Sequence, residues 1–253
     1  MFGSLVVKVR RSLARQGVWG TLRHALSAAN RELRELTPAA RRERRMQEAI
    51  EQEFDRTYNV DTAGLVDLST QNMDNPNWMY GSRYQGIGPQ LFREMVESTG
   101  IHYPDFLFID LGSGKGRALL LASEFPFQCI LGVEFSPKLV EISQWNIQRF
   151  RSDKQQCQAI SVICEDAAAF HFPSEPIVLF MYNPFDHHVM TRVIENIGRS
   201  LENSMQEVIV LYTHPVHGEL WDRSDLFRKV KSTPSYAVWR SARATVSNRL
   251  TNH

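Results

Sequence analysis

The sequence predicts an α/β fold: a doubly wound, mostly parallel seven-stranded sheet with helices on both faces, plus an N-terminal helical extension. Two observations predict the sheet. Runs of Val, Ile, Leu and Phe without polar alternation are typical of strands covered on both faces, and these runs alternate with helix-like segments. A length of 253 residues with 43% hydrophobic content allows one large domain, or one domain with an appendage, around a buried core.

The extension is predicted from residues 1–56, which look helical and are strongly basic at their start. Residues 1–46 contain 11 Lys and Arg against 3 Asp and Glu, whereas residues 47–253 contain 18 against 25. Apolar residues recur along one helix face at spacings of three and four: Trp19, Leu22, Leu26, Ala29, Leu33 and Leu36. We expect this seam to pack on the protein's own body or on a second copy of the helix.

Two other partners remain for the extension. Arginines beside apolar residues, among them Arg10, Arg11 and Arg15, suit an arm that lies on an anionic membrane surface. A basic helix binds the phosphates of nucleic acid by the same attraction, and we rank that partner third. The chain contains neither a signal-peptide pattern nor a run of about 20 apolar residues, the length that spans a bilayer. We therefore expect a cytoplasmic protein, with peripheral membrane attachment as the alternative.

The segment 57–87 is irregular and polar, and it contains Trp78, Tyr80 and Tyr84. A loop of this length and aromatic content is typical of a lid or part of a site, and equally of a packed surface connection. We predict three parts: the basic helical extension at 1–56, this lid-like loop at 57–87 and the main domain at 88–253.

The main domain is predicted to begin with a helix at Pro89, because proline is favoured in the first turn of a helix. Continuous apolar runs then predict strands at 106–111, 129–135, 159–164, 177–182 and 207–212. Helices are predicted at 117–125, 136–150 and 186–201, the second opened by Ser136 and Pro137. Near the end, GELWDRSDLFRKV (218–230) looks helical, and YAVWRS (236–241) looks like a closing strand that can run antiparallel.

Three glycines follow the first predicted strand at alternate positions, Gly112, Gly114 and Gly116, just after Asp110. In sheets of this kind, ligands bind at the carboxyl ends of the strands. Glycine there lets the backbone approach a ligand, take positive φ and aim N–H groups from the start of the next helix. The stretch therefore predicts a cradle for a nucleotide-sized ligand.

Two well-known cradles do not fit this spacing. A dinucleotide fingerprint needs glycine where this chain has Arg117, and a Walker A loop needs Ser or Thr after Lys115, where this chain has Gly116. The pattern that remains, FIDLGSGKGR, resembles motif I of the class I S-adenosylmethionine-dependent methyltransferases. The resemblance covers about residues 80–240 and implies S-adenosyl-L-methionine as the cofactor. It implies that the loop binds this cofactor through Asp110, Gly112, Ser113, Gly114 and Gly116.

Two further elements extend the resemblance. Glu134, at the end of the second strand, corresponds to the family's acid for the ribose hydroxyls, and one carboxylate can accept both. Phe135 corresponds to the residue that lies against the adenine ring. Asp166 and the backbone N–H of Ala167, after the third strand, correspond to the groups that bond the adenine. Read without the resemblance, Asp110 is a helix cap, Glu134 a solvated strand end and Asp166 a turn residue.

The site for the methyl acceptor is expected after the fourth strand, where the chain reads Asn183-Pro184-Phe185. Family members that methylate amines carry Asp, Asn or Ser, then two prolines, then Tyr or Phe, so this chain lacks one proline. The resemblance implies that Asn183 accepts the N–H groups of the amine and that Phe185 faces the cationic centre. Read alone, Asn-Pro is an ordinary turn. Candidates for a base are Tyr80, Tyr84, Tyr182 and His214, and Tyr84 is included in the predicted catalytic set with Asn183, Pro184 and Phe185.

These residues predict an S-adenosylmethionine-dependent methyltransferase that acts on nitrogen, in a protein side chain or a small amine. Transfer to an oxygen of a small molecule is the alternative on the same fold. A non-catalytic module that binds a membrane or partner is the alternative from another class. No metal site is expected, because the three cysteines form no CxxC pair and His214 and His217 have no apparent third ligand besides Glu219.

Overall fold

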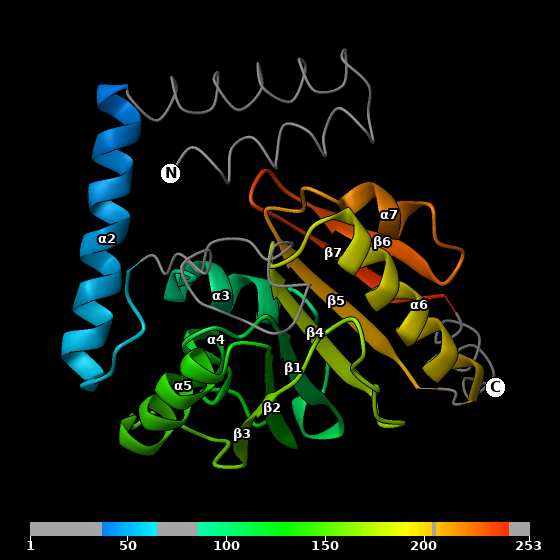
Figure 1. The fold of residues 1–253 in the computed structure, drawn as a ribbon, viewed down its shortest axis with the longest axis horizontal. Coiled ribbons are helices and arrows are strands. Elements are labelled where there is room, and N and C mark those ends of the chain that lie inside the picture. Colours follow the sequence, from blue (N-terminus) through cyan, green and yellow to red (C-terminus); the bar gives the residue numbers. More distant parts are fainter. Residues whose placement is uncertain (1–36, 65–85, 204–205, 243–253) are drawn as a thin grey trace, which may run out of the picture. The chain divides into compact units, whose positions relative to one another are not determined.

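The computed structural model describes residues 37–64, 86–203 and 206–242 (Figure 1). The apolar seam and the basic arm of the predicted extension lie outside the described residues, as does most of the predicted lid, including Tyr80 and Tyr84. Among the residues that are described, no helix is both long enough and apolar enough to cross a membrane.

The chain divides into two compact units with the boundary after Ala49. This boundary falls inside helix α2 (Pro38–Tyr58). Within the first unit, residues 38–49 are helical, as the sequence predicts. Residues 50–56, which the sequence assigns to the extension, belong to the same compact unit as the sheet.

Seven strands form one sheet in the order β3-β2-β1-β4-β5-β7-β6. Their bounds are β1 (Leu107–Leu111), β2 (Cys129–Glu134), β3 (Ile160–Cys164), β4 (Ile177–Tyr182), β5 (Val208–Thr213), β6 (Phe227–Ser232) and β7 (Tyr236–Ser241). Strands β1 to β5 run parallel, and β7 is antiparallel to both β5 and β6. The strand order reverses between β1 and β4, which confirms the predicted doubly wound, mostly parallel sheet.

Helices cover both faces of the sheet, as predicted. On one face lie α3 (Pro89–Glu97), α4 (Arg117–Ala122) and α5 (Pro137–Arg149), and on the other lie α6 (His187–Asn203) and α7 (Gly218–Asp222) (Figure 1). Successive strand residues point to opposite faces, so Phe108 belongs to the first core and Ile109 to the second. Both side chains are buried, which is why the strands read as unbroken apolar runs.

One crossover between successive parallel strands contains a helix, and the next does not. The crossover from β2 to β3 begins with α5, where Ser136 Oγ accepts from the N–H of Leu139 and Pro137 occupies the first turn, as predicted. The crossover from β3 to β4, residues 165–176, contains a turn but no helix. We call residues 165–176 the linker.

The predicted helix at 218–230 was wrong. Helix α7 ends at Asp222, and the chain turns back into β6, so that the rings of Trp221 and Phe227 pack 5.0 Å apart. Strand β6 lies at the sheet edge with most of its side chains exposed, so it lacks the apolar run that revealed the inner strands. Lys229 on this strand donates to Asp222 Oδ2 at 2.6 Å. Exposed lysines on an edge strand also discourage pairing with another chain.

Candidate functional site

The glycine loop joins β1 to α4 at the carboxyl edge of the sheet. Gly112, Gly114 and Gly116 have φ angles of 76°, 55° and 87°, in the left-handed region that glycine enters without penalty. A Cβ atom on Gly112 would lie 2.5 Å from the Cβ of Pro184, so the turn after β4 lies directly against this loop. The segment predicted to bind a cofactor and the segment predicted to bind the methyl acceptor are therefore in contact.

Asp110 and Glu134 are two buried acids beside the loop, with 3% and 4% of their surfaces exposed. Burial raises the pKa of Asp110 well above its ordinary value, and the negative charge of Glu134 adds to the rise. Burial also raises the pKa of Glu134, although N–H groups of Ser136, Gly114 and Phe135 oppose this. Helix α4 has no side-chain cap, so Asp110 is not the helix cap that an isolated reading suggests.

Glu134 fixes the shape of the loop. Its Oε2 accepts from the Gly114 N–H and its Oε1 from the Ser136 N–H, both at 2.9 Å. Each carboxylate oxygen has a second lone pair, so these bonds leave acceptor positions for ligand hydroxyls. The side chain of Ser113 packs against Gly132 of β2: a Cβ atom on Gly132 would lie 2.7 Å from Ser113 Oγ.

Two basic residues, Lys115 of the loop and Arg117 at the start of α4, form hydrogen bonds with residues 51–64, which we call the strap. Lys115 Nζ donates to Asp61 Oδ1 and to the Ala63 carbonyl, both at 2.7 Å. Asn146 of α5 ties the same parts together, because its Nδ2 donates to the carbonyls of Asp61 and Lys115 at 2.8 Å each. Lys115 is thereby turned toward the strap, and no basic side chain of the described residues pairs with Asp110 or Glu134.

Arg117 makes the second attachment to the strap and is 1% exposed. Its Nε donates to Thr62 Oγ1 at 2.7 Å, and its Nη2 donates to the Glu51 carbonyl at 2.8 Å and to Asp55 Oδ1 at 3.1 Å. The guanidinium also lies over the Phe54 ring, 4.6 Å from its centre. Sequence reasoning missed the strap, although two basic residues inside a glycine loop signal that acidic partners must come from elsewhere in the chain.

A narrow cleft opens where β1, β2 and β3 end and the turn after β4 approaches them. Five predicted site residues line it: Gly112, Phe135, Asp166, Ala167 and Phe185. They come from four separate turns of the chain, which the sheet brings together. The cavity volume is about 20 Å³, so the lining side chains must part before a planar ring can enter.

Asp166 also shapes its own turn. Its Oδ1 accepts from the Ala168 N–H at 2.9 Å, and its carbonyl accepts from the Ala169 N–H at 2.8 Å. The turn reading and the ligand reading are compatible, because a carboxylate offers two oxygens. The backbone around Ala167 is thus held at the cleft wall.

On the acceptor side, Asn183 has a φ of 41°, a left-handed conformation that asparagine tolerates better than most residues. Its Oδ1 accepts from Tyr212 Oη at 3.1 Å. Burial raises the pKa of Tyr212 to about 12, so its hydroxyl stays protonated and keeps donating at neutral pH. Sequence reasoning missed Tyr212, because it sits within a buried strand and only the pairing of β4 with β5 brings it beside Asn183.

Two of the four predicted bases meet at this edge. The rings of Tyr182 and His214 stack with centroids 5.5 Å apart. Burial raises the pKa of Tyr182 to about 12, with a further contribution from the charge of Glu51, so Tyr182 is protonated at neutral pH and a poor base. His214 is exposed. His214 stays a predicted base.

Comparisons with known proteins give structural likenesses only. Neither a protein-family model nor a curated protein sequence matches the chain. An RNA methyltransferase from Salinibacter ruber, solved with S-adenosyl-L-homocysteine, is 19% identical at a TM-score of 0.42, over 60% of this chain and 89% of that one. Magnesium protoporphyrin IX methyltransferase from Synechocystis, solved with S-adenosylmethionine, is 13% identical at 0.42, over 60% and 76%. TrmN from Thermus thermophilus is 14% identical at 0.47, over 61% of this chain but about half, 49%, of its own length.

Proposed function

We propose that this chain is a class I S-adenosylmethionine-dependent methyltransferase that transfers a methyl group to nitrogen, in a protein side chain or a small amine. One observation carries the proposal. Gly112, Phe135, Asp166, Ala167 and Phe185, assigned to cofactor and acceptor from separate sequence motifs, line one cleft at the carboxyl edge of the sheet.

The chemistry of the loop suits this cofactor. S-adenosylmethionine carries ribose hydroxyls, an ammonium and a sulfonium, all of which favour carboxylate neighbours. Asp110 and Glu134 supply two buried carboxyl groups without a basic partner among the described residues, and the cations of a ligand would lower the pKa of both. Glycine is required at two positions of the loop by close packing: a Cβ atom on Gly112 would collide with Pro184, and one on Gly116 with Ser143.

When bound, S-adenosylmethionine supplies an electrophilic methyl group. The residues of the chain then have to hold an acceptor lone pair in line behind that methyl, and this positioning supplies much of the rate. Asn183 is set for this task, because Tyr212 fixes its amide while the oxygen keeps a second acceptor position for an amine N–H. Phe185, two residues further along the same turn, lines the cleft. His214 would accept the proton of the amine.

Calorimetric titration of the full chain with S-adenosylhomocysteine tests the proposal. We expect saturable binding with one molecule per chain. An absence of heat at high protein concentration, from folded protein, would contradict the assignment.

Replacement of Glu134 by Ala is expected to weaken S-adenosylhomocysteine binding by about 1–3 kcal/mol, since ribose hydroxyls lose a charged acceptor and the Gly114 N–H loses its partner. Glu165→Ala is the matched control, because Glu165 is an acid of the same cleft with no predicted bond to the ligand. Equal affinity of Glu134→Ala and the wild-type protein would remove Glu134 from the site.

Asn183 separates nitrogen transfer from oxygen transfer. Asn183→Gly keeps the left-handed backbone and deletes the amide, so methylation of an amine should fall about tenfold or more while cofactor affinity holds. Tyr212→Phe, which deletes only the hydroxyl that positions Asn183, should give a smaller loss in the same direction. Activity that survives Asn183→Gly but is lost in His214→Ala would support transfer to an oxygen instead.

A further inference from the structure

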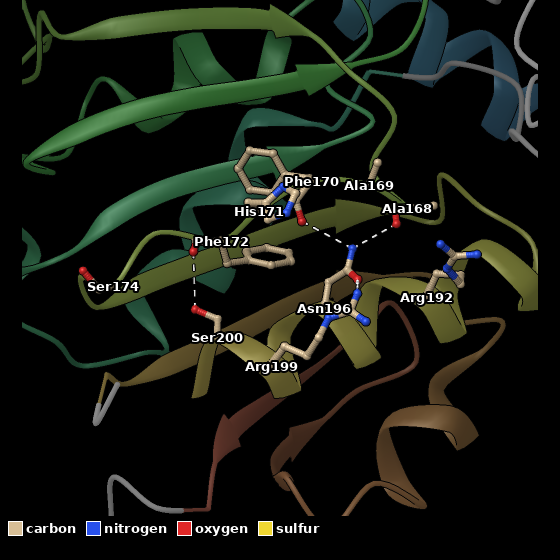
Figure 2. A pocket seen from close by; sticks show the side chains of 10 residues that line it. All are labelled: Ala168, Ala169, Phe170, His171, Phe172, Ser174, Arg192, Asn196, Arg199 and Ser200. Carbon is tan, nitrogen blue, oxygen red and sulfur yellow. Dashed lines mark hydrogen bonds between the residues drawn. The ribbon is translucent and has the colours of Figure 1, made fainter. Parts of the chain in front are cut away.

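A second cavity lies between α6 and the linker, and its lining residues differ from those of the cleft described above (Figure 2). Its volume is about 570 Å³, within the range of about 300–1,000 Å³ typical of small-molecule sites. The linker, which contains no helix, forms one side of the cavity, and α6 forms the other. Residues 168–172 and Ser174 form one wall, and Arg192, Asn196, Arg199 and Ser200 form the other. We call this cavity the arginine pocket.

The walls of the arginine pocket are fastened to each other by buried hydrogen bonds. Asn196 is 7% exposed, and its Nδ2 donates to the carbonyls of Ala168 and Phe170 at 2.9 and 3.3 Å. One helical turn further on, Ser200 Oγ donates to the Phe172 carbonyl at 3.4 Å. Figure 2 shows these bonds crossing from α6 to the linker. The pocket is therefore a fixed feature of the fold and not a gap between independent segments.

The same asparagine orients a cation. Asn196 Oδ1 accepts from Arg199 Nη2, which fixes one edge of the guanidinium. A guanidinium has five N–H donors. Arg192 lies four residues before Asn196 in α6. It is exposed and makes no hydrogen bond or ion pair with any residue that the structure describes.

The charge of the arginine pocket is opposite to the net charge of residues 47–253. No acidic residue lines it, although Asp and Glu outnumber Lys and Arg by 25 to 18 over residues 47–253. A concave surface lined by one sign of charge concentrates counter-ions. Arginine forks pair with phosphate and carboxylate groups through two parallel hydrogen bonds.

The spacing of the arginines restricts the shape of a ligand. Arg192 and Arg199 are seven residues apart on α6, which places their Cα atoms roughly 10 Å apart along the helix. Both arginines line the pocket, so each guanidinium can bind a separate anionic group of one ligand. The linker wall of the pocket contributes Phe170, Phe172 and small residues, which suit an uncharged body.

We propose that the arginine pocket binds an elongated small molecule with an anionic group, phosphate or carboxylate, at each end. Arg192 binds one group and Arg199 binds the other. This inference goes beyond methyl transfer and does not depend on it, because none of its residues belongs to the proposed cofactor or acceptor site.

The test is calorimetric titration of the full chain, without S-adenosylmethionine, at low salt. The probes are fructose 1,6-bisphosphate, adipate and inorganic phosphate, which separate a bisphosphate, a dicarboxylate and a single anion. We expect one of the two-ended probes to bind at least about tenfold more tightly than inorganic phosphate. Arg192→Ala and Arg199→Ala should each weaken that binding about tenfold.

Arg228→Ala is the matched control, because Arg228 is an exposed arginine on β6, and it should leave affinity unchanged. Arg199→Ala also removes the hydrogen bond to Asn196 and can change the pocket wall. The affinity of Arg192→Ala for the probe is then decisive, since Arg192 has no partner among the described residues. The proposal is overturned if no two-ended probe binds at millimolar concentration, if inorganic phosphate binds as tightly, or if Arg228→Ala weakens binding equally. Loss of S-adenosylhomocysteine binding would leave this result unaffected, so the two proposals fail separately.

Discussion

Gly112→Val is expected to abolish S-adenosylhomocysteine binding and to lower the free energy of unfolding by about 2–5 kcal/mol. The left-handed φ of 76° accounts for about 1–2 kcal/mol of this loss. Overpacking accounts for about 1–3 kcal/mol, because the new Cβ would lie 2.5 Å from the Pro184 Cβ and 3.7 Å from the Phe185 ring. Calorimetric titration measures the loss of binding and urea unfolding the loss of stability.

Substitutions at two other glycines distinguish the conformational contribution from the overpacking contribution. Gly100 has a φ of 61°, and a Cβ atom there would have no neighbouring atom within 4 Å, so Gly100→Ala carries the conformational penalty alone. Gly88 has open space around it and a φ of −68°, so Gly88→Ala should change little. If Gly112→Val binds S-adenosylhomocysteine as the wild-type protein does, the close contact between the glycine loop and the turn after β4 is not part of the site.

Arg117→Met is expected to lower the free energy of unfolding by about 3–5 kcal/mol, the range for removing one partner of a buried ion pair. The substitution leaves Asp55 without its cation and the Glu51 carbonyl without the Arg117 donor. Asp55 also accepts from the N–H groups of Thr62 and Ala63 at 2.7 and 2.6 Å, so residues 59–64 should loosen. Urea unfolding gives the stability change, and hydrogen exchange at Thr62 and Ala63 reports the loosening.

Arg228→Met is the control for Arg117→Met, since Arg228 is exposed on the edge strand. It should change the free energy of unfolding by no more than about 0.5 kcal/mol. Unchanged exchange at residues 59–64 in Arg117→Met would mean that the strap is held by other contacts, such as the bonds of Asn146 to Asp61.

The sequence was sufficient for the inner strands of the sheet and for the position of the glycine loop because their signals are local. Strands buried on both faces show as unbroken apolar runs, and Ser136 with Pro137 marks the start of α5. Edge strand β6 was missed for the complementary reason: with one face and one edge in solvent, its Arg and Lys residues conceal the strand pattern.

The parts of the site that the sequence could not predict depend on contacts between distant residues. The partner of Arg117 is Asp55, 62 positions earlier, and the partner of Asn183 is Tyr212, 29 positions later. Neither pair has a spacing that periodicity can reveal. The arginine pocket was missed as well, because Arg192 and Arg199 read as ordinary exposed helix residues until the linker is seen to lack a helix.

A crystal structure of the full chain with S-adenosylhomocysteine tests the central claim most directly. The account predicts the adenine against Phe135 with Asp166 and Ala167 at its edge, and the ribose hydroxyls on Glu134. A ligand bound elsewhere, or a loop in which Glu134 and Gly114 stay bonded while the cleft remains closed around its own side chains, would contradict it.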